Sequence, residues 1–92
     1  MSGPAEFPPD STFIHADVWG GEGGWSWQVG HATCDRDGGS ETFDDVTERS
    51  AKTRRDATLA ALLQAVRLAV EYPEVTYIEI TSPPHASMKV WL

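Results

Sequence analysis

Apolar residues recur along the chain with two different periods, and the change of period separates strands from a helix. Residues 12–18 carry Phe13 and Ile14, which suit a pleated, half-buried surface, and predict a first strand. Residues 25–34 and 41–48 predict a second and a third strand. The third segment is rich in charge, which is typical of an edge strand because charged side chains oppose pairing with other chains.

Two turns are predicted between these strands. Residues 20–24 contain four glycines, and glycine tolerates the positive φ angles of tight turns. Residues 35–40 contain Asp37-Gly38, a strong hairpin signal. The glycine run lacks the spacing of a phosphate-binding loop, and strands flank it on both sides, so we interpret it as structural.

The segment that follows predicts a helix. Thr53 and Asp56 fit a capping box, in which the two side chains satisfy free N–H groups of the first turn. Tyr72-Pro73 predicts the end of the helix. The large apolar residues recur at helical spacing and are expected to face the core; they are Leu59, Leu62, Leu63, Val66 and Val70. Gln64, Arg67 and Glu71 are expected to line the opposite face.

Residues 75–80 predict a last strand, parallel to the first because a helical crossover joins parallel strands. Pro83-Pro84 should end it, and residues 85–92 are expected to form a short helix. Residues 1–11 are rich in proline and predict a disordered segment, which leaves residues 12–92 as a single domain. The expected fold class is α+β, a βββαβ mixed sheet with one main helix.

Charge and cysteine content narrow the classes of partner. The 92 residues carry a net charge of −7, which disfavours nucleic acid because its binding depends on neutralised phosphates. Arg49, Lys52, Arg54 and Arg55 cluster before the helix; we favour a solvated helix start, with a phosphate-facing patch as the alternative. The lone Cys34 favours a reducing, cytoplasmic location. A secretory signal and a membrane span are not expected.

Metal and cofactor chemistry is not indicated. His15, His31 and His85 form no zinc-binding pattern, and the acidic residues of the second hairpin do not match a calcium loop. We therefore expect no metal, no cofactor and no catalytic residues. Asp17 is interpreted as a polar residue at the end of a strand, with a residual role as the alternative.

Four segments resemble the ribonuclease H family when their order is considered. Residues 53–61 resemble its T-N-N-x-A-E-L-x-A pattern, and residues 78–82 resemble its strand ending in Asp-Ser. Residues 14–17 resemble its first strand, which ends in a catalytic Asp, and residues 25–29 resemble its G-W-G-x-V second strand. The resemblance spans residues 12–82 and implies a ribonuclease H-like fold, in which the first-strand Asp helps to hold catalytic magnesium.

The same resemblance argues against the family's activity. Asp17 matches the first catalytic carboxylate, but Thr58 stands where the family has Glu and Thr81 where it has Asp. The fourth acidic position, the fifth strand and the last helix are expected to lie beyond residue 92. A neutral hydroxyl cannot supply the charge that two-metal hydrolysis needs. The resemblance therefore implies a truncated, catalytically inactive domain.

The leading hypothesis is a non-catalytic protein–protein interaction module. Truncation should leave residues 75–80 without an outer neighbour, and exposed strand edges recruit partners. The expected partner-binding residues beside that edge are Met88, Val90, Trp91 and Leu92; the alternative is that this tail folds back and covers the edge. Trp19 and Trp25 form a second expected surface, with packing across their hairpin as the alternative.

Composition adds a suggestion about the kind of partner. A small acidic chain rich in Ala, Asp, Arg and Gly resembles phage or mobile-element proteins from high-GC hosts, which often bind and disable a host protein. The expected partner is a host cytoplasmic protein or a second copy in a homodimer. Two alternatives stay open: a ribonuclease H-like nuclease completed by oligomerisation, and an acidic DNA mimic.

Overall fold

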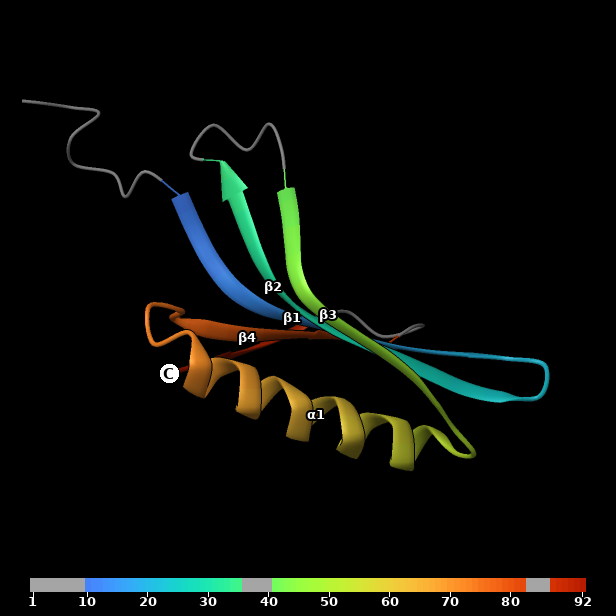
Figure 1. Ribbon diagram of the computed structural model, residues 1–92. Coiled ribbons are helices and arrows are strands. Elements are labelled where there is room, and N and C mark those ends of the chain that lie inside the picture. Colours follow the sequence, from blue (N-terminus) through green and yellow to red (C-terminus); the bar gives the residue numbers. More distant parts are fainter. Residues whose placement is uncertain (1–9, 36–40, 83–86) are drawn as a thin grey trace, which may run out of the picture.

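The computed structural model describes residues 10–35, 41–82 and 87–92 and has an α+β fold (Figure 1). Its elements, in chain order, are β1 (Asp10–Gly21), β2 (Gly24–Asp35), β3 (Glu41–Ala51), α1 (Arg54–Glu71), β4 (Tyr77–Thr81) and β5 (Met88–Trp91). The strands form one mixed sheet in the order β3-β2-β1-β4-β5. Helix α1 packs on one face of this sheet.

Strand β1 lies at the centre of the sheet and fixes its topology. It pairs antiparallel with β2 and parallel with β4, and α1 makes the crossover between β3 and β4. The predicted parallel pairing of the first and fourth strands is therefore confirmed. The charged strand β3 lies at an edge, as predicted. The first turn is tight: Gly21 pairs with Gly24, and Gly23 has a φ of 89°, which favours glycine.

The core lies between the sheet and α1. Alternation along β1 turns Ile14, Ala16 and Val18 towards the helix, and each of them is fully buried. The sheet's other contributions to this core are Trp27, Val29, Ile78 and Ile80, and Val75 adds to it from the loop before β4. A single apolar layer thus joins β1, β2 and β4 to the helix.

The prediction of which helix face meets the core was wrong. The buried face of α1 consists of Ala57, Ala61, Ala65 and Leu68, which recur at i, i+4 and i+3 spacing. Small side chains let the helix axis approach the sheet closely, so the alanine face packs on the sheet and the bulkier face does not. The residues expected in the core instead point away from the sheet; Leu59, Leu63, Val66 and Val70 are all more than half exposed, and only Leu62 packs partly against the core.

Both ends of the helix follow the sequence. The Thr53 hydroxyl accepts a hydrogen bond from the Asp56 N–H at 3.0 Å, which satisfies one free donor of the first turn. The helix ends at Glu71, and the Tyr72 N–H donates to the Leu68 carbonyl at 3.0 Å. The Thr53 part of the predicted capping box is therefore confirmed, as is the end before Pro73.

The C-terminal segment differs from its prediction. The expected helix over residues 85–92 is wrong, because Met88–Trp91 form β5. This strand pairs antiparallel with β4, placing Trp91 opposite Tyr77 and Lys89 opposite Glu79. The alternative in which the tail covers the edge of the preceding strand is thus confirmed. The predictions that the β4 edge is uncovered and that a fifth strand is missing were wrong, and β5 is the edge strand.

Several predicted boundaries also shift. Strand β1 begins at Asp10, so the predicted disordered segment 1–11 overlaps it; residues 1–9 lie outside the described residues. Strand β3 extends to Ala51, three residues beyond its expected end. The predicted second hairpin turn falls mainly on residues 36–40, and Pro83-Pro84 on residues 83–86, both outside the described residues.

The alanine face makes a specific prediction about stability. Ala61 is 1% exposed against the sheet, so Ala61→Leu should overpack the interface and lower the free energy of unfolding by about 1–3 kcal/mol. The neighbouring Ala60 is only partly buried, so Ala60→Leu should lower the free energy of unfolding by a clearly smaller amount. Urea denaturation of the two variants tests this difference; equal losses of stability would contradict the packing described here.

Candidate binding face

The sheet face opposite α1, which we call the open face, carries aromatic and polar side chains in transverse rows. Paired residues on neighbouring strands share a face, so the register identifies the members of each row. The first row crosses all five strands through Trp91, Tyr77, Phe13, Ala32 and Phe43. Figure 1 shows α1 on the other side of the sheet.

The aromatic members of this row contact one another. The Phe13 and Tyr77 rings stack with their centroids 4.9 Å apart and their planes 5° from parallel. The Trp91 ring lies 4.9 Å from Tyr77, and the Lys89 ammonium lies 5.0 Å from the centre of the Tyr77 ring. Aromatic pairs at these distances add to the stabilisation from burial. The row therefore attaches the edge strand β5 to the centre of the sheet.

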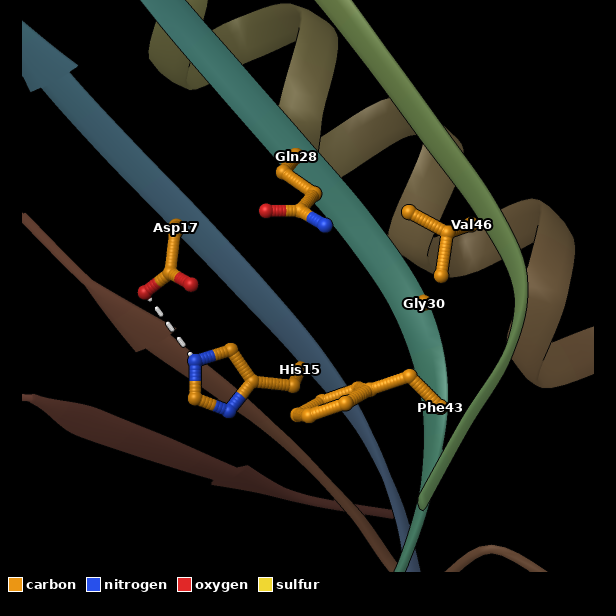
Figure 2. Close-up of a pocket in the computed structure, with 6 residues that line it drawn as sticks. All are labelled: His15, Asp17, Gln28, Gly30, Phe43 and Val46. Carbon is orange, nitrogen blue, oxygen red and sulfur yellow. Dashed lines mark hydrogen bonds and ion pairs between the residues drawn. The ribbon is translucent and has the colours of Figure 1, made fainter. Parts of the chain in front are cut away.

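The next row is polar and is centred on His15. Its Nε2 lies 3.0 Å from an Asp17 carboxylate oxygen, and its Nδ1 lies 3.6 Å from a Glu79 carboxylate oxygen. Figure 2 shows His15 and Asp17 pointing towards each other from β1, with the Phe43 ring beside the imidazole. The His15 and Phe43 rings meet edge to face at 5.8 Å. Two carboxylates and one imidazole thus lie beside the aromatic row.

A small hollow of about 110 Å³ opens next to this histidine. Its lining includes His15, Asp17, Gln28, Phe43 and Val46, together with Gly30 (Figure 2). A Cβ atom at position 30 would lie 3.0 Å from the Val46 side chain, so glycine relieves crowding where β2 and β3 approach. The hollow has room for a few waters or one projecting side chain of a ligand, but not for a large substrate.

Two of the three positions that resemble ribonuclease H catalytic residues lie together. Asp17 and Thr81 are paired neighbours on β1 and β4, as the resemblance expects. Thr58 lies on α1, as expected, but α1 packs on the face of the sheet opposite Asp17, and the Thr58 hydroxyl donates to the Arg54 carbonyl at 2.8 Å. In the described part of the chain, no group of three His, Cys, Asp or Glu residues is arranged to hold a metal ion. Asp17 and Glu79 both contact His15 instead.

The predicted partner-binding residues of the tail divide between the two faces of β5. Trp91 joins the aromatic row on the open face and is 68% exposed. Met88 and Val90 pair with Ile80 and Ile78, so they lie on the face that α1 occupies elsewhere, and both are exposed. Leu92 follows the strand, and its N–H donates to the Thr76 carbonyl at 2.9 Å.

The two tryptophans beside the glycine turn both line a hollow of about 220 Å³ at the end of the hairpin. Trp19 pairs with Ser26, whereas Trp25 pairs with Gly20, which places the two indoles on opposite faces of the hairpin. The Trp25 ring lies directly over Gly20, so packing across the hairpin, the alternative for these residues, accounts for Trp25. Arg54 lies 6.0 Å above the same ring.

Arg54 also donates a hydrogen bond to the Ser82 hydroxyl at 3.2 Å. One member of the predicted basic cluster is therefore held between β2 and the end of β4. This contact helps to fix the start of α1 relative to the sheet.

A second polar cluster lies at the other end of α1 and was missed by the sequence analysis. His31 is 6% exposed, and its ring stacks on Tyr72 with centroids 4.0 Å apart. The Tyr72 hydroxyl donates to the Asp45 carboxylate, which raises the pKa of Tyr72 from 10 to about 12. Asp45 has a φ of 53° at an irregularity in the pairing of β2 with β3. The Asp44-Asp45 pair within a strand was the only signal of this irregularity in the sequence.

Comparison of the chain with protein-family models, curated proteins and solved structures found no match. Among the described residues, no helix is long and apolar enough to cross a membrane. The geometry of the open face is therefore the main basis for a functional proposal.

The neutral residues at positions 58 and 81 lead to a prediction about catalysis. We expect no cleavage of an RNA/DNA hybrid in magnesium or manganese, because Asp17 lacks carboxylate partners at both positions. Gel analysis of a labelled hybrid, with Asp17→Asn as the matched control, provides the measurement. Cleavage that disappears in Asp17→Asn would contradict the prediction.

The Tyr72–Asp45 hydrogen bond predicts a change with pH. Because the pKa of Tyr72 is raised to about 12 in the folded chain, this bond stabilises the fold below pH 10 and is lost as the pH rises through 12. In a near-ultraviolet titration, Asp45→Asn should move the ionisation of Tyr72 part of the way back towards pH 10, because it weakens the hydrogen bond to Tyr72 and removes the charge. Asparagine also tolerates the positive φ at this position. Tyr72→Phe identifies which part of the absorbance change comes from Tyr72. An unchanged pKa of Tyr72 in Asp45→Asn would refute Asp45 as the cause of the raised pKa.

Proposed function

We propose that this chain is a non-catalytic module that binds a protein partner through its open face and the adjoining edge strand β5. One observation carries the proposal: an aromatic row reaches the surface at Trp91, which is 68% exposed on an edge strand. Trp is enriched among the residues that dominate binding energy at interfaces. An edge strand additionally offers unpaired backbone groups to an incoming strand.

The polar row supports a partner with mixed chemistry. Asp17 and Glu79 are partly exposed beside the aromatic row, with Lys89 paired across from Glu79. A partner segment with one apolar anchor and one basic side chain would match this arrangement, because the anchor can contact Trp91 while the cation faces the carboxylates. The net charge of −7 favours the same choice.

We also propose a ribonuclease H-like relationship for the fold. It is supported by the sheet order β3-β2-β1-β4-β5, by the parallel pairing of β1 with β4, and by the neighbouring positions of Asp17 and Thr81. In this proposal the chain keeps the ribonuclease H-like fold, and its central strand β1 contributes to partner binding. A host cytoplasmic protein, bound by a phage-encoded inhibitor, is the kind of partner that composition suggests.

Substitution of Trp91 tests the proposed binding face. Trp91→Ala should weaken partner binding by about 2 kcal/mol or more, roughly thirtyfold in affinity. The chain should stay folded by circular dichroism, because Trp91 contributes to the sheet only from its edge. Affinity capture from the native host should identify the partner, and isothermal titration with the purified partner should measure the loss.

Met88→Ala is the matched control on the same strand. Its side chain is 58% exposed but lies on the other face of β5. Loss in Trp91→Ala alone assigns binding to the open face, and loss in both assigns it to the edge as a whole. Full binding by Trp91→Ala would refute the proposal and direct attention to Trp19.

A further inference from the structure

The outer side of α1 carries an apolar stripe that has no partner among the described residues. The stripe consists of Leu59, Leu63, Val66 and Val70, which are 51%, 56%, 52% and 76% exposed. It lies opposite the buried alanine face, on the side of the helix that points away from the sheet (Figure 1). Exposed apolar surface that is continuous in this way marks interaction sites in folded proteins.

The spacing of the residues in the stripe indicates which kind of element would pack on it. Its members are separated by four, three and four residues, which is the a/d spacing of helices that pack side by side. The helix has 18 residues and is about 27 Å long, so the stripe follows most of its length. A second helix lying nearly parallel or antiparallel to α1 would bury all four side chains.

Charge along the helix selects the partner and its direction. At the N-terminal end of α1, Lys52, Arg54 and Arg55 outnumber Asp56, whereas Glu71 ends the helix and no basic residue lies in its last turn. Two copies packed in parallel would bring like charges together at both ends. Two antiparallel copies would place each basic end beside the acidic end of the other copy and would oppose the two helix dipoles favourably.

The stripe also has a self-complementary antiparallel register. When Leu63 of one copy faces Val66 of the other, Leu59 faces Val70, and the same pairs repeat on the other side of a two-fold axis. Arg55 is four residues before Leu59, and the helix ends at Glu71, one residue after Val70, so this register brings Arg55 within one helical turn of Glu71 along the axis. Such an arrangement is an isologous interface, the commonest kind in homodimers.

We propose that the chain forms a homodimer through antiparallel packing of α1 on α1 of a second copy. The dimer has four layers, with both helices between two sheets. Its two open faces point outwards, which leaves the proposed partner-binding face accessible in each copy. The inference does not depend on the function proposed for that face.

The oligomeric state in solution tests this proposal. Sedimentation equilibrium of the full chain should give a dimer that dissociates on dilution, and Leu63→Lys should raise the dimer dissociation constant at least tenfold. The lysine would place two like charges at the centre of the interface. Because Leu63 is more than half exposed in one copy, the variant should keep its circular dichroism spectrum. Gln64→Lys adds the same charge one residue away from the stripe and should dimerise like the parent.

Charge exchange tests the direction of packing. Arg55→Glu should weaken the antiparallel dimer by severalfold, and Glu71→Arg in the same chain should restore it. Parallel packing predicts no rescue by Glu71→Arg, because positions 55 and 71 of the two copies would lie at opposite ends of the dimer.

Three results would overturn the proposal. The first is a parent chain that is monomeric at every concentration tested. The second is a dimer that Leu63→Lys leaves intact and Trp91→Ala dissociates, which would place the interface on β5. The third is a Leu63→Lys chain with a lower free energy of unfolding than the parent at concentrations where both are monomeric, which would mean that the stripe is covered within a single chain.

Discussion

The fold depends on how one helix covers a five-stranded sheet. The outermost strands of such a sheet lie about 19 Å apart, at 4.7–4.9 Å per strand spacing, whereas a helix with its side chains is only about 10–12 Å wide. Helix α1 therefore packs on β1 and β2, near the centre, and reaches β3 only weakly. Strand β4 adds Ile78 and Ile80 to the core, but β5 and the whole opposite face have to be stabilised by other contacts.

Those other contacts are largely aromatic. Phe13 is 4% exposed although it faces away from the helix, because it lies in the row that includes Tyr77. The row carries lateral stabilisation to β5, which α1 does not cover. The same side chains that hold the edge strand in place also form the surface proposed for binding, so stability and recognition share residues on this face.

The sequence predicted the strands better than the helix orientation. The first four strands and the parallel pairing of the first with the fourth followed from alternating β-formers and from the crossover rule, which depend on local pattern and chain connectivity, whereas β5 was not predicted. The helix is apolar on both sides, and large residues suggested Leu59 and Leu63 for the core. Close packing selected Ala61 and Ala65 instead, and this choice depends on the distance between helix and sheet, which no local pattern contains. The His15–Glu79 proximity likewise required the pairing of strands distant in sequence.

The irregularity between β2 and β3 has a consequence for how β3 presents its side chains. On one side of it Ala32 pairs with Phe43, and on the other Gln28 pairs with Glu48, so an odd-numbered and an even-numbered residue share the open face. The extra residue near Asp45 shifts the phase of the strand by one position. Without it, a register that kept Glu48 on this face would turn the Phe43 ring to the helix side and leave His15 without its edge-to-face neighbour. The bulge thus lets a single edge strand supply both an aromatic and a charged residue to one surface.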